Sequence, residues 1–213
     1  ICRLAAQQLL SEHSWDKVAE RSEAAVRAIA QEKPKSPPKV GWISSFNTPC
    51  GIATYSQHLV DVFPDQVSVF ASYTTNKVTK DANNIYRCWT QDCFDPLWQL
   101  RSTIKKQAPD VLIIQFNFGF YDLKSLSALI NEAKDDNRNV TIMLHATDDS
   151  ALPQEKHLSQ IKSALARCDR LLVHSYHDMN RLKGIGLEDN VSLFPHGVPF
   201  IDPTDAAVTR SDA

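Results

Sequence analysis

The sequence contains no long hydrophobic run, which excludes a transmembrane helix. Its purely aliphatic stretches span only Val111–Ile114 and Leu171–Val173, whereas a membrane-spanning helix needs about 20 apolar residues. The first segment has a charged amphipathic pattern without an apolar centre, so no signal peptide is predicted. The chain starts with Ile1 rather than Met, and we therefore expect it to be a fragment of a longer protein.

An excess of charge of one sign is also missing. Lys and Arg number 23 against 25 Asp and Glu, for a formal net charge of −2. This balance provides no broad basic surface for nucleic acid or for an anionic membrane. The five cysteines, an odd number scattered along the chain, indicate reduced thiols rather than a disulfide framework. We expect a cytoplasmic protein that binds neither nucleic acid nor membrane.

Glycine is scarce, with 6 residues, and the glycine-based nucleotide motifs are missing. Neither G-x-G-x-x-G nor G-x-x-x-x-G-K-[ST] occurs, which disfavours NAD and P-loop nucleotides. Cys88 and Cys93 are the only close pair of cysteines, and their spacing predicts no zinc site. No G-x-S-x-G, no H-E-x-x-H and no Cys–His nucleophile pair is found, which disfavours a hydrolase.

The residues that are present divide the chain into four segments. Apolar residues at helical spacing predict an amphipathic helical segment over residues 1–33. A proline-rich linker follows at 34–38. Short apolar runs then alternate with amphipathic segments over 39–198, which we expect to be one domain. Residues 199–213 are predicted to be a tail or linker.

The domain is predicted to be a Rossmann-like, doubly wound α/β fold with a mostly parallel sheet. Three of its apolar runs are continuous rather than alternating, which is typical of parallel strands covered by helices on both faces. The predicted strands are Val40–Ser44, Gln66–Phe70, Tyr86–Trp89, Val111–Gln115, Val140–Leu144, Leu171–His174 and Val191–Phe194. The predicted helices are Ile52–Phe63, Pro96–Gln107, Leu123–Asp135, Gln154–Arg167 and Tyr176–Lys183.

Ligands of such sheets bind at the carboxyl ends of the strands, and several polar residues fall there. His145 directly follows a predicted strand, where a neutral imidazole can hydrogen-bond a ligand hydroxyl or act as an acid or base. The alternative is a histidine held by a backbone carbonyl. Asp148 lies just beyond it as a second candidate contact, or simply as a helix cap.

The first strand leads into a polar turn and a helix that starts near Cys50, Gly51 and Ile52. A helix N-terminus there offers unpaired N–H groups and a positive dipole end to a phosphate. A plain strand-to-helix turn remains the alternative.

Further along, Gln115 and Asn117 end a strand among aromatic residues, an arrangement that can hold a sugar. Phe118 and Phe120 are predicted to belong to the core. His174 and His196 end the last two strands. His174 is either a ligand contact or a buried histidine with its hydrogen bonds satisfied.

Taken together, these loops resemble the amino-terminal domain of retaining GT-B glycosyltransferases, over about Val40 to Val198. The residues that carry the resemblance are Pro49–Tyr55, Pro109–Gln115, Phe118–Gly119, Leu144–His145, Val173–Ser175 and Phe194–Val198. In that family the amino-terminal domain mainly binds the acceptor, and a second Rossmann-like domain binds the nucleotide sugar.

The resemblance implies transfer of a hexose from a UDP- or GDP-linked sugar to a saccharide acceptor with retention of configuration, as in polysaccharide synthesis. His145 would be the catalytic residue, close to the donor sugar, and Cys50, Gly51 and Ile52 would lie close to the donor diphosphate. The acceptor or sugar contacts implied are Gln115, Asn117, Asp148, His174 and His196. No metal and no cofactor besides the nucleotide-sugar co-substrate are expected.

The tail Pro199–Ala213 carries no second Rossmann-like domain and no Glu-x7-Glu motif. We therefore expect the chain to be the acceptor-side half of a larger enzyme, inactive alone and excised from a tandem or multidomain glycosyltransferase whose donor domain is missing. Two alternatives remain: a non-catalytic carbohydrate-binding or docking domain with the same fold, and another GT-B enzyme such as a sugar-nucleotide epimerase.

Overall fold

The computed structural model describes residues 37–63, 67–91, 94–148 and 156–197. The chain divides into two units, residues 1–38 and 39–213. The amphipathic segment predicted over 1–33 and the tail predicted over 199–213 lie outside the described residues. The fold below is therefore that of the second unit.

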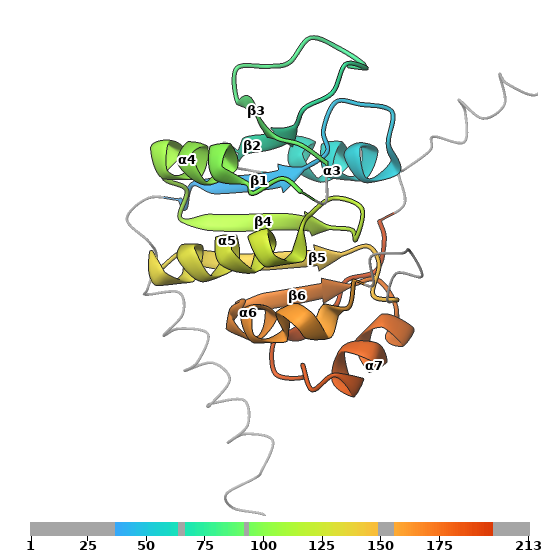
Figure 1. The fold of residues 1–213 in the computed structure, drawn as a ribbon. Helices are drawn as coiled ribbons and strands as arrows, with labels where there is room; N and C mark the ends of the chain where they lie inside the picture. Colours follow the sequence, from blue (N-terminus) through green and yellow to red (C-terminus); the bar gives the residue numbers. More distant parts are fainter. Residues whose placement is uncertain (1–36, 64–66, 92–93, 149–155, 198–213) are drawn as a thin grey trace, which may run out of the picture. The chain divides into compact units, whose positions relative to one another are not determined.

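Seven strands form one sheet in the order β3-β2-β1-β4-β5-β6-β7, and every neighbouring pair is parallel (Figure 1). The strands are β1 Val40–Ser44, β2 Val67–Ser72, β3 Ile85–Trp89, β4 Val111–Phe116, β5 Asn139–Leu144, β6 Arg170–Val173 and β7 Val191–Leu193. The strand order reverses between β1 and β4. This arrangement confirms the predicted Rossmann-like α/β fold.

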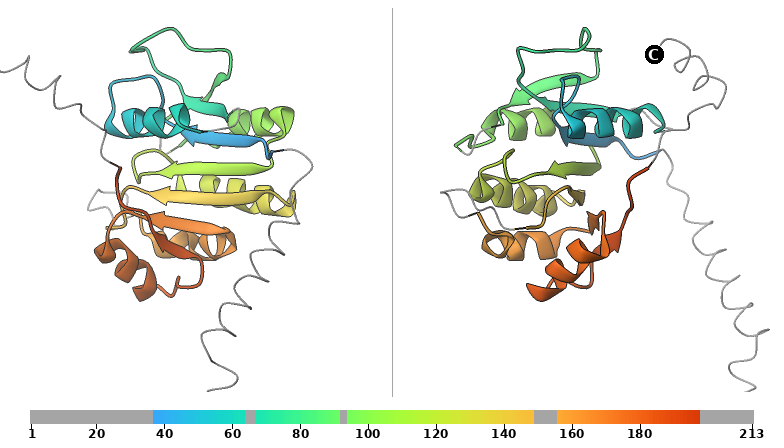
Figure 2. Two further views of the ribbon diagram at one scale, coloured as in Figure 1. Left: turned by 180° about the vertical axis from the view of Figure 1, so that it is seen from behind. Right: turned by 90° about the vertical axis from the view of Figure 1, so that its right-hand side faces the viewer.

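Helices cover both faces of the sheet (Figures 1 and 2). The α-helices are α3 Gly51–Asp61, α4 Trp98–Gln107, α5 Leu123–Asp135, α6 Lys162–Arg167 and α7 Tyr176–Gly184. In the views of Figure 2, α4, α5 and α6 lie in a row on one face, and α3 lies on the other. Within the described ranges, no helix is long and apolar enough to cross a membrane.

The two faces of the sheet bury two separate sets of apolar side chains. In β1, Ile43 joins the large cluster beneath α4, α5 and α6, whereas its neighbour Trp42 joins a smaller cluster packed against α3. This alternation follows from the two-residue period of a strand. Gly41 allows close packing on the first of these faces, since a Cβ there would lie 2.6 Å from the ring of Phe70 and 2.9 Å from Leu112.

Several predicted boundaries differ from those in the structure, and two of the differences lie in the second half of the domain. The segment predicted as one helix over Gln154–Arg167 contains a 3₁₀ turn, Leu158–Ile161, before α6. Leu158 and Ile161 are both buried, and their three-residue spacing matches the tighter period of a 3₁₀ turn. The strand predicted to end at His174 ends at Val173, which pairs with Leu144, the last residue of β5.

Helix α3 is fixed to the end of β1, and this contact positions the start of the helix. The Ser44 and Ser56 hydroxyls are both buried and lie 2.7 Å apart. A buried hydroxyl pair of this kind satisfies two polar groups that burial would otherwise destabilise. The loop from Ser45 to Cys50 is therefore held at both ends, because the strand before it and the helix after it are joined to each other.

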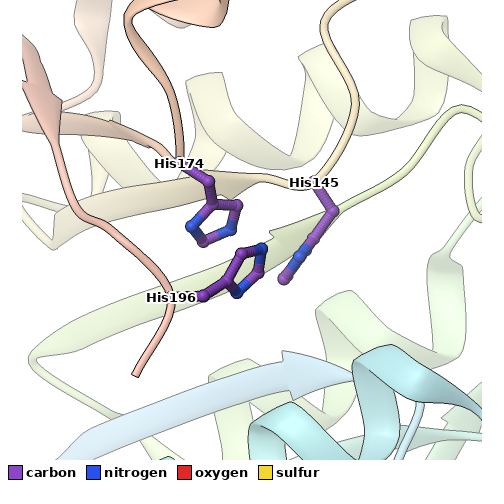
Figure 3. Close-up of side chains that lie close together, drawn as sticks. All are labelled: His145, His174 and His196. Carbon is purple, nitrogen blue, oxygen red and sulfur yellow. The ribbon is translucent and has the colours of Figure 1, made fainter. Parts of the chain in front are cut away.

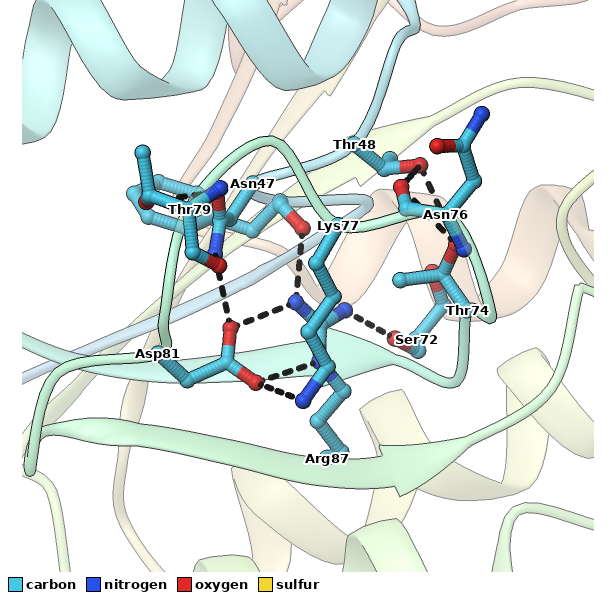
Figure 4. A network of polar contacts seen from close by, with 10 residues as sticks. Asn47, Thr48, Ser72, Thr74, Asn76, Lys77, Thr79, Asp81 and Arg87 are labelled. Atoms are coloured by element: carbon cyan, nitrogen blue, oxygen red, sulfur yellow. Dashed lines mark hydrogen bonds and ion pairs between the residues drawn. The ribbon is translucent and has the colours of Figure 1, made fainter.

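The same loop is held on its other side by the side chain of Arg87 in β3 (Figure 4). Its guanidinium donates to both carboxylate oxygens of Asp81, at 3.0 and 2.7 Å. It also donates to the carbonyls of Ser72, at 2.6 Å, and Phe46, at 3.1 Å. Arg87 therefore ties together the loops that follow β1 and β2. Its hydrogen bonds hold the pKa of the Asp81 carboxyl far below its usual value.

Asn47 extends this network by hydrogen bonds in both directions (Figure 4). Its Nδ2 donates to Asp81 at 2.9 Å and to the carbonyl of Thr79 at 2.8 Å, and its Oδ1 accepts from the Thr79 N–H at 2.9 Å. Asn47 has a positive φ of 50°, a conformation that asparagine tolerates better than most residues. The network thus fixes the turn that leads into α3.

Replacing Arg87 with Met is expected to destabilise the domain by about 2 to 4 kcal/mol, because the largely buried Asp81 carboxylate loses its main partner. Urea unfolding followed by circular dichroism would measure this change. The matched control is Lys105→Met, which removes an ion pair to Glu132 from a side chain that is 60% exposed and should change the free energy of unfolding by no more than about 1 kcal/mol. Equal effects of the two replacements would show that the Arg87 network does not anchor the loop.

Candidate functional site

Four polar side chains meet at the carboxyl edge of the sheet, beside the point where the strand order reverses. Gln115 lies in the last part of β4, and His145 follows β5 directly. His174 follows β6, and His196 comes shortly after β7. Because parallel strands all end on one edge, residues far apart in sequence are brought together here. Figure 3 shows the three histidine rings side by side.

The three imidazoles are in direct contact with one another. The ring centroids of His174 and His196 are 3.7 Å apart, and the rings are stacked with an interplanar angle of 19°. His145 lies 4.9 Å from His174 and 6.1 Å from His196. We call these three residues the histidine cluster. His196 is exposed, whereas His145 and His174 are half-buried, so the cluster opens to solvent on one side.

Tyr55 of α3 closes the other side of the histidine cluster. Its ring lies edge-on to all three imidazoles, with centroid distances of 5.1 Å to His145, 5.6 Å to His174 and 5.1 Å to His196. Tyr55 is not among the site residues predicted from the sequence. Its position one helical turn after Gly51 could have indicated it, since residues i and i+4 lie on one helix face.

Two carbonyl oxygens set the protonation of the half-buried imidazoles. Nε2 of His145 lies 2.7 Å from Oε1 of Gln115, and Nδ1 of His174 lies 2.8 Å from the backbone carbonyl of Phe194. A carbonyl oxygen can only accept, so each of these ring nitrogens carries the proton. In the neutral rings, Nδ1 of His145 and Nε2 of His174 are therefore left as acceptors.

Buried polar atoms without a hydrogen-bond partner gather around the histidine cluster. Among the described residues five buried side-chain atoms have no partner, and three of them are the Tyr55 hydroxyl, Nε2 of Gln115 and Nε2 of His174. Such atoms are uncommon in folded proteins because each loses its hydration without compensation. Three of them at one edge of the sheet indicate a place where a polar ligand supplies the missing partners.

Burial keeps the half-buried imidazoles neutral. It lowers the pKa of His145 to about 4, and the neighbouring His174 and His196 lower it further in the same direction. Burial also lowers the pKa of His174, although the carbonyl of Phe194 acts against this effect. Both rings are therefore uncharged near neutral pH.

The start of α3 adds an anion-binding feature to the same edge. Gly51 is exposed, and a Cβ at this position would meet no atom within 4 Å. Burial disfavours ionisation of the Cys50 thiol, but the Ser45 hydroxyl and the N–H groups of Ala53 and Ile52 outweigh it and lower the pKa of Cys50. The first turn of α3 thus favours negative charge, as expected at the positive end of a helix dipole.

The loop after β5 is attached to the start of α7, which holds His145 and His174 in place. Ser175 caps α7 by accepting from the N–H of Asp178. The Asp178 carboxylate accepts from the hydroxyls of both Ser175 and Thr147, each at 2.5 Å. The two loops that carry the half-buried histidines are thereby joined by one carboxylate.

Two predicted site residues have other partners in the structure. Oδ1 of Asn117 accepts from the N–H of Gly119 at 2.9 Å, within a tight turn. Asp148 is 73% exposed and pairs with Arg181 at 3.1 Å and with His177 at 3.6 Å. The polar partners of Asn117 and Asp148 are thus Gly119, Arg181 and His177 rather than the histidine cluster. Phe118 and Phe120 are buried in the core, as predicted.

No protein-family model and no curated protein sequence matches the chain. The proposed function is therefore argued from the fold, the geometry of this site and the sequence.

The pH dependence of His145 follows from its burial. In the folded chain its pKa of about 4 lies below the value of about 6.5 expected when unfolded, so the unfolded chain binds the proton more tightly. The free energy of unfolding should therefore fall as the pH is lowered from about 6.5 to 4.

An NMR titration of the His145 ring protons would measure this pKa directly. In a His196→Ala variant the midpoint should rise, because a neighbouring positive charge is removed. A midpoint near 6.5 in the unmodified chain would contradict the burial argument.

Proposed function

We propose that this domain is the acceptor-side half of a retaining glycosyltransferase that transfers a hexose from a nucleotide sugar to a saccharide. The proposal rests mainly on the position and state of His145. Its imidazole is neutral, is hydrogen-bonded to Gln115, and lies beside a helix N-terminus at the carboxyl edge of the sheet. Such an edge is where α/β sheets bind their ligands. The sequence resemblance to the GT-B family supports the same assignment.

The unpartnered groups of the site match the hydrogen-bonding capacity of a sugar. Nδ1 of His145 and Nε2 of His174 are acceptors, whereas the Tyr55 hydroxyl and Nε2 of Gln115 can donate. A sugar hydroxyl both donates and accepts, so neighbouring hydroxyls of one ring can satisfy groups of both kinds. We propose that His145 accepts a hydrogen bond from a hydroxyl of the donor sugar.

The first turn of α3 would bind the donor diphosphate. Gly51 leaves space beside the N–H groups of the helix start, and these groups together with the helix dipole stabilise an anion. Tyr55 links this turn to the histidine cluster, so the diphosphate and the sugar would lie next to each other. Gln115 would line the acceptor side, and Asn117 would shape the turn beyond it.

In the proposed reaction the bond between the sugar C1 and the diphosphate oxygen breaks, and a bond from C1 to an acceptor hydroxyl oxygen forms on the same face. The acceptor proton ends on the departing diphosphate. Negative charge grows on that diphosphate as the bond breaks, so preorganised N–H groups at Gly51 and Ile52 stabilise the transition state more than the ground state. Basic residues of the donor-binding domain would supply the remaining countercharge.

His145→Ala, made in the protein that joins this domain to a donor-binding domain, should lower hexosyl transfer by about 100-fold or more, because the donor sugar loses a contact made at the reacting centre. Transfer from UDP- and GDP-linked hexoses would be assayed by release of the nucleoside diphosphate, and NMR of the product would show whether the anomeric configuration is retained.

The matched control is His58→Ala, which removes an exposed histidine from α3 and should leave transfer unchanged. Circular dichroism of both variants would establish that the fold is intact. Unchanged turnover in a folded His145→Ala protein would contradict the proposed role of His145, and inversion of configuration would contradict the proposed reaction class.

A further inference from the structure

The histidine cluster has the composition of a metal-binding site. Among the described residues, His145, His174 and His196 form the one group of histidine, cysteine or carboxylate side chains whose potential ligand atoms all lie within 4.8 Å of one another (Figure 3). We propose that these three histidines bind one divalent transition-metal cation, for which Zn²⁺ is the best match. This proposal does not depend on hexosyl transfer. It uses the same two acceptor nitrogens, Nδ1 of His145 and Nε2 of His174, so a bound cation would take the place of a sugar hydroxyl at these atoms.

Hydrogen bonds to protein carbonyl groups orient two of the three histidine rings for metal binding. Metal-binding histidines almost always donate their other ring N–H to a carbonyl or carboxylate, which fixes the tautomer. His145 donates to Oε1 of Gln115, and His174 donates to the carbonyl of Phe194. The lone pairs left free are those of Nδ1 in His145 and Nε2 in His174. The latter is buried and has no hydrogen-bond partner among the described residues.

The chemistry of the ligand set selects the kind of cation. A transition metal binds an unprotonated ring nitrogen, and the hydrogen bonds to Gln115 and to the carbonyl of Phe194 leave one such nitrogen in His145 and one in His174. Three nitrogen ligands without a carboxylate suit Zn²⁺, Cu²⁺ or Ni²⁺, whereas Mg²⁺ and Ca²⁺ require oxygen ligands. Three protein ligands also leave a fourth position of a tetrahedral ion open.

Metal binding requires a small rearrangement of the cluster. A tetrahedral Zn²⁺ with Zn–N distances of about 2.0–2.1 Å brings its ligand nitrogens to about 3.3 Å from one another, closer than the 4.8 Å limit found here. The stacked rings of His174 and His196 must also rotate apart to point at one ion. His196 is exposed, so its ring can rotate without disturbing the core.

Tyr55 lies where it can act on the open fourth position. Its ring is edge-on to each of the three imidazoles, and its hydroxyl is buried without a partner. A water or ligand hydroxyl on the bound cation would supply that partner. This accounts for a buried phenol that the fold alone leaves unsatisfied.

The test is calorimetric titration of the full 213-residue chain with Zn²⁺ alone, together with measurement of bound zinc after gel filtration. We expect one Zn²⁺ per chain, loss of this binding in His174→Ala and in His196→Ala, and unchanged binding in the control His58→Ala. No stoichiometric binding by the unmodified chain would overturn the proposal. So would binding that persists in a folded His174→Ala or His196→Ala protein.

Two further measurements keep the proposal testable if a histidine variant fails to fold. The visible spectrum of the Co²⁺-loaded unmodified chain should be that of a tetrahedral site with nitrogen ligands, and a thiolate charge-transfer band would place the ion on cysteine and overturn the proposal. Gln115→Met, which removes the acceptor for His145, should weaken Zn²⁺ binding by about 10- to 100-fold. An unchanged dissociation constant in that variant would contradict the role of Gln115 as the positioning residue.

Discussion

All seven strands of the sheet are parallel, and this constraint determines where the chain can place its chemistry. Each strand ends at the same edge, so the residues that follow β4, β5, β6 and β7 converge although they are far apart in sequence. The reversal of strand order between β1 and β4 separates the loop into α3 from the loops that carry the histidines. Tyr55 reaches across and joins the two sides.

Hydrogen bonds then fix which atoms of these converging residues can bind a ligand. The carbonyl oxygens of Gln115 and Phe194 each fix one proton on an imidazole and thereby orient the lone pair of the other nitrogen. The same groups would serve a sugar hydroxyl or a metal ion, because both are recognised by an acceptor nitrogen held in place. Near neutral pH, burial keeps His145 and His174 uncharged.

The strands of the sheet could be predicted from the sequence because a continuous apolar run such as Val111–Ile114 indicates a buried parallel strand, whatever the rest of the chain does. It also placed His145, His174 and His196 at strand ends. It did not predict that they touch, because strand order is a tertiary property that the pattern of one strand does not contain. Tyr55 lies one helical turn after Gly51, but this spacing does not show that its ring contacts three histidines that follow other strands. The 3₁₀ turn at Leu158–Ile161 was missed because its apolar spacing also fits an α-helix.

Both proposed ligands depend on one feature, which is that His145 and His174 each present one unprotonated nitrogen to a shared ligand site. Long-range ¹H–¹⁵N correlation spectra of the imidazoles at pH 7 test it directly, because they report which ring nitrogen carries the proton. The account predicts the Nε2–H tautomer for His145 and the Nδ1–H tautomer for His174, both neutral. The opposite tautomer in either ring, or a doubly protonated ring, would contradict it.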